Sequence, residues 1–137
     1  MAGYSGKPLA QKLGIRPGCR MYVQDRPSDY LSLLGPLPPE VVLLPRATGR
    51  VDLVHLFTRE AAGLARALEE LRHRIAQDGV IWVSWPKKSA KVVTDVTEDV
   101  IRELALPLGL VDVKVCAVDE TWSGLKLVIR RANRKEK

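Results

Sequence analysis

The residues best suited to ligand chemistry gather at the end of one apolar run, VIWVSWPKKSA at positions 80–90. There Trp85 and Pro86 lead into two adjacent lysines, Lys87 and Lys88. Two neighbouring ammonium groups at the mouth of a strand would attract a phosphate or a carboxylate. The same residues are also typical of a solvated turn, in which the proline fixes the backbone and the lysine side chains are hydrated. The stretch therefore indicates either an anion-binding site or a rigid strand exit.

A second candidate is the pair of tryptophans that flank loops, Trp85 and Trp122. Large amphipathic rings are enriched at ligand and partner surfaces, where one side of the ring is apolar and the other is wet. A tryptophan at a strand end also packs at the rim of a core. Contact with a ligand or partner is therefore a hypothesis that stands beside a packing interpretation.

Other familiar chemistries lack their partner residues. His55 lies inside an apolar strand and His73 on a helix among arginines, and neither has a cysteine or a second histidine at metal-ligand spacing. No serine has the glycine-flanked turn of a nucleophile. Asp95, with Glu98 three residues later, resembles a helix-capping box, and Asp119 falls in a turn. We predict no catalytic residue, no metal site and no bound cofactor.

Short apolar runs between turn residues predict an alternation of strands and helices. The clearest helix is predicted between Leu64 and Ile75, where apolar residues recur at helical spacing; Thr58 would cap it and Asp78-Gly79 would stop it. Strands are expected at 19–24, 41–44, 51–57, 80–85, 111–118 and 125–129, with shorter helices at 8–13, 28–34 and 95–108. This order predicts an α/β fold, a three-layer, Rossmann-like sandwich with a mostly parallel sheet and an antiparallel C-terminal strand.

Such a sheet gives the candidate residues a common edge. In open α/β sheets, ligands bind outside the carboxyl ends of the strands, where the strand order reverses. The expected strand ends place Asp119 near this edge as well. We predict a ligand-binding site there, formed by Trp85, Lys87, Lys88, Trp122, Asp25 and Thr58.

Length and composition fit a single α/β domain, which we place at residues 1–130, followed by a basic, disordered tail at 131–137. No segment approaches the roughly 20 apolar residues that a membrane helix needs, and the start lacks the apolar core of a secretory signal. Only two cysteines occur, Cys19 and Cys116, far apart in sequence. We expect them to be buried thiols in a cytoplasmic protein, with a disulfide between them as the alternative.

The net charge of +6 raises the question of a nucleic-acid partner. Residues 130–137 hold five basic residues and one acidic residue, a net charge of +4 that leaves only +2 for the first 129 residues. A basic tail can bind phosphates by releasing counterions, and it can also be a solvated end. A nucleic-acid accessory role therefore depends on the tail alone.

Several strings of the sequence resemble a bacterial family known as domain of unknown function 3052. They are GYSGKPLAQKLGI near the start, WVSWPKK in the middle, and TDVTEDVIRE followed by GLVDVKVCAVDETWSGLKLVIRR near the end. The resemblance implies a truncated class I methyltransferase-like fold. It implies no activity.

A cofactor site of that fold would need features that these residues lack. A glycine-rich turn should follow the first strand so that the backbone can approach S-adenosylmethionine (SAM), yet residues 24–29 contain no glycine. The second strand should end in a carboxylate for the ribose hydroxyls, but Pro45 and Arg46 follow it. Between Arg46 and Val51 there is no room for the helix and strand that normally wall the adenine.

The leading interpretation is a non-catalytic, cytoplasmic binding or interaction domain. Its ligand would be an anionic small molecule, or its partner another protein, held through Trp85, Lys87, Lys88 and Trp122. One alternative is a SAM-dependent methyltransferase with a nonstandard cofactor site. The other is a nucleic-acid accessory protein that acts through its basic tail.

Overall fold

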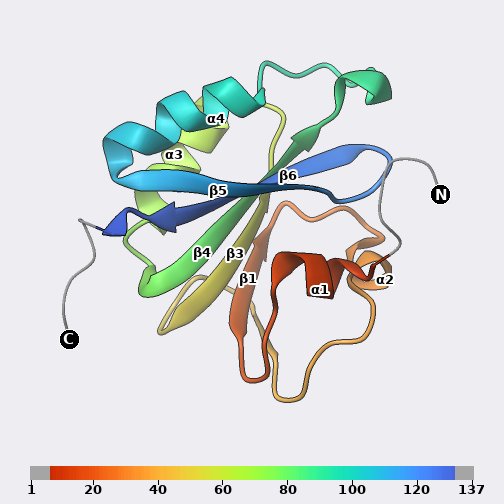
Figure 1. Ribbon diagram of the computed structural model, residues 1–137, viewed down its shortest axis with the longest axis vertical. Helices are drawn as coiled ribbons and strands as arrows, with labels where there is room; N and C mark the ends of the chain where they lie inside the picture. The colour runs from red at the N-terminus through yellow and green to blue at the C-terminus, as the bar shows by residue number, and fades with distance from the viewer. Residues whose placement is uncertain (1–6, 132–137) are drawn as a thin grey trace.

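The computed structural model describes residues 7–131 and places six strands in one sheet, in the order β2-β1-β3-β4-β6-β5 (Figure 1). β1 to β4 run parallel, whereas β6 is antiparallel to both of its neighbours, β4 and β5. The strands are β1 (Arg20–Gln24), β2 (Val42–Leu44), β3 (Val51–Phe57), β4 (Ile75–Pro86), β5 (Leu110–Ala117) and β6 (Trp122–Ile129). The predicted α/β class, with a mostly parallel sheet and a reversed C-terminal strand, is confirmed.

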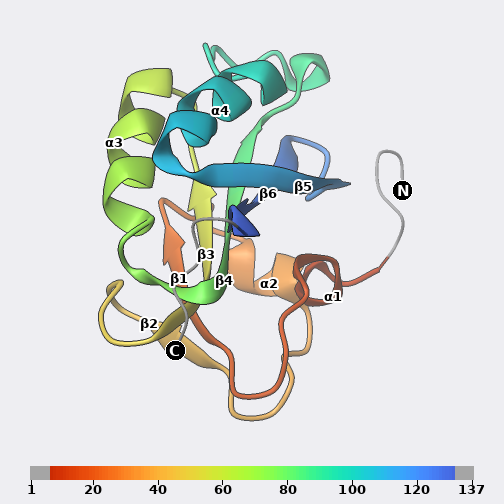
Figure 2. The ribbon, with the colours of Figure 1, turned by 60° about the vertical axis from the view of Figure 1, so that its left-hand side comes forward.

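Helices cover both faces of the sheet, which makes three layers (Figure 2). α1 (Leu9–Leu13) and α2 (Tyr30–Leu34) lie on one face, and α3 (Ala61–Leu71) and α4 (Glu98–Ala105) lie on the other. Short 3-10 turns occur at Lys88–Ala90 and Leu106–Leu108. None of the helices within residues 7–131 is long and apolar enough to cross a membrane.

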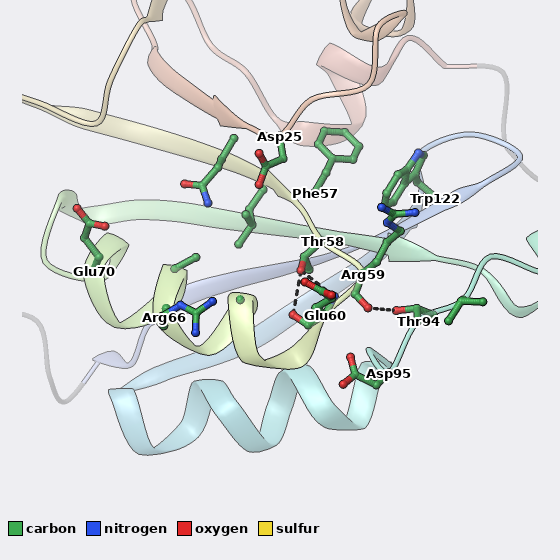
Figure 3. Close-up of a pocket in the computed structure, with 15 residues that line it drawn as sticks. Asp25, Phe57, Thr58, Arg59, Glu60, Arg66, Glu70, Thr94, Asp95 and Trp122 are labelled. Carbon is green, nitrogen blue, oxygen red and sulfur yellow. Dashed lines mark hydrogen bonds between the residues drawn. The ribbon is translucent and has the colours of Figure 1, made fainter.

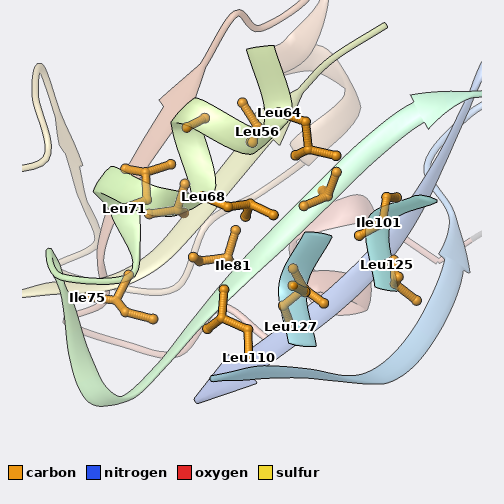
Figure 4. Close-up of a cluster of buried hydrophobic side chains, with 14 of the residues drawn as sticks. Leu56, Leu64, Leu68, Leu71, Ile75, Ile81, Ile101, Leu110, Leu125 and Leu127 are labelled. Atoms are coloured by element: carbon orange, nitrogen blue, oxygen red, sulfur yellow. The ribbon is translucent and has the colours of Figure 1, made fainter. Parts of the chain in front are cut away.

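The central strand β4 joins two hydrophobic cores because both of its faces are buried. On the α3 and α4 side, Ile81 and Val83 pack with Leu68 and its neighbours (Figure 4). On the opposite side Trp82 is completely buried, and its indole Nε1 donates a hydrogen bond to the Leu13 carbonyl at 3.1 Å. The apolar run at 80–85 is therefore a central strand that is covered on both faces.

Helix α3 is shorter than its apolar spacing predicts. It ends at Leu71, and Ile75 already belongs to β4, where it pairs with Val51. The predicted stop at Asp78-Gly79 lies inside that strand, at an irregularity where the pairing jumps to Leu53 with Val80. A side chain at Gly79 would place its Cβ 2.9 Å from the Ala76 carbonyl oxygen. The glycine serves a bend in the strand, and sequence spacing could not separate that role from a helix end.

The connection from β2 to β3 is unusually short for a parallel crossover. It must pass β1 in six residues, 45–50, although such connections ordinarily take a dozen or more residues and include a helix. Leu44 and Ala47 pack against the core on the α3 side, so the connection crosses on that face. Because it carries no helix, the part of β1 beside α3 has no helical cover of its own.

A fully buried polar chain lies on the other side of β3. Tyr30 Oη is 2.8 Å from His55 Nδ1, and His55 Nε2 is 2.7 Å from Ser84 Oγ. Both ring nitrogens thus have a partner, which allows a neutral imidazole to be buried at low cost. Burial lowers the pKa of His55 from its ordinary 6.5 to about 3. His55 is the satisfied core histidine that its place in an apolar strand indicates.

We expect His55 to make the fold sensitive to acid. The unfolded chain takes up a proton below pH 6.5, whereas the folded chain does so only near pH 3, so stability is lost as the pH falls through this window. The contribution is about 1.4 kcal/mol per pH unit. Urea unfolding from pH 7 to pH 4.5 should show a shallower pH dependence in His55→Gln than in the parent. The exposed-residue control, His73→Gln, should keep the parent slope; an unchanged slope in His55→Gln would contradict a neutral buried imidazole.

Candidate functional site

A groove of about 1280 Å³ lies at the carboxyl ends of β1 and β3 (Figure 3). The chain leaves β1 toward β2 on one side, while β3 flanks β1 on the other, so this is the point where the strand order reverses. From β1 the groove takes only Gln24, the last residue of the strand, and Asp25 follows it, so the groove lies at the carboxyl end of the face that the short β2 to β3 connection leaves without a helix. The general rule for ligand sites in open α/β sheets therefore places a binding site here.

Helix α3 forms one wall of the groove. Its residues Gly63 and Ala67 line the groove one turn apart, and Arg66 and Glu70 line it beside them. A Cβ added to Gly63 would meet no atom within 4 Å, because the space beside it is the groove. The two small residues leave open space along this wall, and the two charged side chains lie beside that space.

The rim opposite β1 is held by a set of hydrogen bonds between two loops. The Arg59 carbonyl accepts a hydrogen bond from Thr94 Oγ1 at 2.7 Å and one from the Asp95 backbone nitrogen at 3.3 Å. Asp95 Oδ1 in turn accepts a bond from the Ala61 backbone nitrogen at 2.7 Å. The loop before α4 is thereby fastened to the start of α3.

These bonds correct two predicted helix caps. Asp95 does not begin α4: the N-cap is Thr97, whose Oγ1 accepts a bond from the Val100 backbone nitrogen, and Asp95 caps α3 from across the groove rim. Thr58 does not cap α3 either, because its hydroxyl donates to the Glu60 carbonyl in a local turn and α3 begins after Glu60. Long-range pairing decided the role of Asp95, and its sequence neighbours could not reveal it.

Aromatic rings form the remaining wall. Phe57 stacks on His55 at a centroid distance of 4.3 Å and meets Trp122 edge to face at 5.1 Å. Phe57 and Trp122 line the groove, and the Tyr30 ring contacts Phe57 edge to face at a centroid distance of 5.6 Å. In Figure 3 the Arg59 side chain extends toward Trp122. The groove thus has an apolar side that continues into the core.

Charges of both signs remain uncommitted around the groove. The side chains of Asp25, Arg59, Glu60 and Arg66 line it, and within residues 7–131 they form neither salt bridges nor side-chain hydrogen bonds. Asp25 also holds a left-handed backbone, with φ of 56°, at the very end of β1. That conformation is uncommon outside glycine, although aspartate tolerates it better than most residues.

The structure brings together three of the six residues predicted for the site and separates the others. Asp25, Thr58 and Trp122 line the groove. Trp85 is 9% exposed and packs in the core on the α3 side. Lys87 and Lys88 do not line the groove; they stand at the 3-10 turn after β4, where the Lys87 backbone nitrogen donates to the Thr121 carbonyl at 2.8 Å.

Sequence reasoning missed the wall formed by α3. Gly63 and Arg66 are not among the predicted site residues, yet both line the groove. A glycine inside a helical pattern was the available signal, because it weakens a helix and needs a reason. The predicted turn position of Asp119 is confirmed, because its Oδ1 accepts hydrogen bonds from the Thr121 and Trp122 backbone nitrogens at 2.8 Å in the hairpin turn.

The groove does not fit SAM in the manner that the fold implies. The turn after β1 begins with the left-handed Asp25 and has no glycine, so it lacks the residue that lets a backbone approach the cofactor closely. No residue of β2 or of the connection that follows it lines the groove. The ribose and adenine would therefore lack a carboxylate partner and a wall. Nor do the described residues contain a group of three potential metal ligands.

Comparison with known proteins gives a family and a fold. A family model described as "Protein of unknown function (DUF3052)" matches residues 42–131. No curated protein matches the chain. Similar solved structures include a ribosomal protein L11 methylase from Lactobacillus delbrueckii subsp. bulgaricus, with 12% identity and a TM-score of 0.55 over 90% of this chain and 76% of that one.

Two further structures have the same architecture. A TehB-like SAM-dependent methyltransferase from Corynebacterium glutamicum is 14% identical, with a TM-score of 0.56 over 94% of this chain and 91% of that one. LepI, in its complex with SAM, is 11% identical, with a TM-score of 0.57 over 90% of this chain. The chain spans only 47% of LepI. At these identities the likeness shows the fold alone, which is methyltransferase-like.

We expect Asp95→Ala to destabilise the protein by about 1 kcal/mol, because α3 loses the carboxylate that caps its first turn. Hydrogen exchange should accelerate in the first turn of α3 rather than in α4. The control is Glu103→Ala, an exposed position of α4, which should change stability by less than about 0.5 kcal/mol. Faster exchange confined to α4 would instead show that Asp95 caps α4, as the capping-box pattern of Asp95 and Glu98 predicts.

Proposed function

Because the chain belongs to the DUF3052 family, whose description assigns no function, we propose a role from the site itself: a non-catalytic binding domain that holds a small polar molecule in the groove between β1 and α3. A cytoplasmic setting is part of this proposal. It is supported by the free thiols of Cys19 and Cys116, which fit a reducing compartment. Burial raises the pKa of both thiols, so neither is an activated thiolate.

The observation that carries the proposal is Gly63. Glycine inside a helix costs roughly 0.5–1 kcal/mol relative to alanine. Gly63 has no left-handed backbone, and nothing lies within 4 Å of an added Cβ, so neither conformation nor packing requires a glycine there. The remaining reason is the space that its missing side chain leaves in the groove. Local rules of this kind are broken mainly where function needs it.

The non-catalytic part rests on how the hydroxyl and imidazole groups in and near the groove are engaged. The hydroxyls that line it, on Thr58 and Thr94, each donate to a backbone carbonyl. The Ser84 hydroxyl and the His55 imidazole do contact each other, but both are completely buried beneath Phe57 and do not line the groove. The lining residues offer charge, shape and aromatic surface, which are the means of binding.

We expect substitutions at Gly63 to separate stability from binding. Gly63→Ala should raise the free energy of unfolding by roughly 0.5–1 kcal/mol, as alanine favours the helix. Gly63→Met should fold equally well but project a side chain into the groove. In a thermal-shift screen of polar metabolites, compounds that raise the melting temperature of the parent should lose that effect in Gly63→Met.

The matched control is Ala62→Met, the preceding residue of α3, which is exposed and does not line the groove. It should retain every stabilising compound. If no compound stabilises the parent, or if Gly63→Met retains them all, the groove is not the binding site.

The fold favours one alternative, a SAM-dependent methyltransferase with a nonstandard cofactor site, since solved methyltransferases share the architecture. A ligand that binds only the native state must stabilise it in proportion to the logarithm of its concentration. Because the groove lacks the features that hold the cofactor, we expect neither SAM nor S-adenosylhomocysteine to raise the melting temperature. A concentration-dependent rise with either compound would favour the enzyme.

A further inference from the structure

We propose that the groove recognises a zwitterion, a small molecule that carries both an ammonium and a carboxylate group, as a free amino acid does. The inference rests on the proposed binding function and specifies its ligand. It follows from which charges around the groove are already engaged and which are free to meet a ligand.

The strongest anion site of the groove is occupied by the protein itself. The amino end of a helix attracts anions through its free backbone N–H groups and its dipole. At α3 this position is taken by the Asp95 carboxylate, which accepts the Ala61 N–H at 2.7 Å. A phosphate would have to displace a carboxylate there. A ligand of high negative charge is therefore disfavoured.

Two cations that line the groove, Arg59 and Arg66, have no salt-bridge partner within residues 7–131. Arg59 extends toward Trp122 (Figure 3), so Arg66 is the one next to the open wall of α3 that remains for an anionic group. Arg66 lines the groove beside Gly63 and Ala67, and its guanidinium forms no salt bridge or hydrogen bond with any residue in the described range. A guanidinium can bind a carboxylate through two parallel N–H bonds. Its position next to the smallest residue of α3 lets a carboxylate approach from the groove.

A carboxylate on the opposite side remains for a cationic group. Asp25, directly after β1, lies across the groove from α3 (Figure 3), whereas Glu60, the second unpaired carboxylate, directly precedes α3. Glu70 also lines the groove but is held by Arg74 at 3.7 Å. An ammonium near Asp25 and a carboxylate near Arg66 would satisfy both signs at once. The apolar part of the ligand would then face Trp122, which is partly exposed, and Phe57 beside it, which is 2% exposed.

The experiment uses the full-length protein and follows Trp122 fluorescence during titration with each standard L-amino acid. Trp82 is completely buried and Trp85 nearly so, whereas Trp122 lines the groove, so a change that disappears in Trp122→Phe reports on the groove. Each amino acid that binds is then compared with its N-acetyl derivative, which lacks the cation, and with its carboxamide, which lacks the anion. We expect each derivative to bind at least about tenfold more weakly, as for loss of one charged contact.

Two variants assign the charges. Arg66→Gln should weaken binding of the amino acid at least about tenfold and leave binding of its carboxamide unchanged. Asp25→Asn should likewise weaken binding of the amino acid at least about tenfold and leave binding of its N-acetyl derivative unchanged. The matched controls are Arg16→Gln and Asp78→Asn, which lie outside the groove and should bind as the parent does. Circular dichroism verifies that each variant is folded.

The inference is overturned if no amino acid binds, or if the singly charged derivatives bind as well as their parents. Should another metabolite then stabilise the parent but not Gly63→Met, the binding function stands and only the zwitterionic ligand is wrong. Should nothing that stabilises the parent depend on Gly63, both the ligand and the proposed function fail.

Discussion

The six-residue connection between β2 and β3 is the constraint on which the rest of the molecule depends. A chain that must pass β1 in residues 45–50 has no room for a helix, so one face of β1 stays uncovered beside α3. Leu44 and Ala47 pack against the core on that face. The part of the face at the carboxyl ends of the strands remains open and forms the groove.

The groove is rigid on two of its sides because its walls belong to larger networks. Phe57 connects the surface ring of Trp122 with the buried imidazole of His55, so the aromatic wall is an extension of the core. On the other side, the Asp95 carboxylate and the Arg59 carbonyl fasten two loops to the start of α3. Preorganised walls reduce the entropy cost of binding, which suits a site that works by recognition.

The methyltransferase-like fold and the departures from a methyltransferase site have one physical origin. The sheet order and the helices on its two faces follow from burial, which the truncated chain still achieves through two cores around β4. Cofactor binding would need features of the turn after β1 and of the segment after β2, and those are the parts that the short crossover and Asp25 replace. A fold can thus persist while the site it carries changes.

Much of the fold was determined by the sequence alone, because periodicity records burial directly. The apolar run at 80–85 indicated a strand, which the structure shows as part of β4, and the turn residues between the apolar runs indicated the alternation of strands and helices along the chain. Periodicity was insufficient at α3, where Ile75 continues the helical spacing of Leu71 yet pairs with Val51 in the sheet. Both arrangements bury the same side chain, so the pattern of burial does not distinguish them.

The site was decided mostly by tertiary structure. The sequence placed Asp25, Thr58 and Trp122 at the right edge because strand ends share an edge in any parallel sheet. It could not show that Trp85 turns into the core, that Lys87 and Lys88 stand away from the groove, or that Asp95 caps a helix 34 residues earlier in the chain. The physical reason is that a residue's neighbours in sequence set its backbone conformation, whereas the direction and partners of its side chain are set by elements distant in the chain.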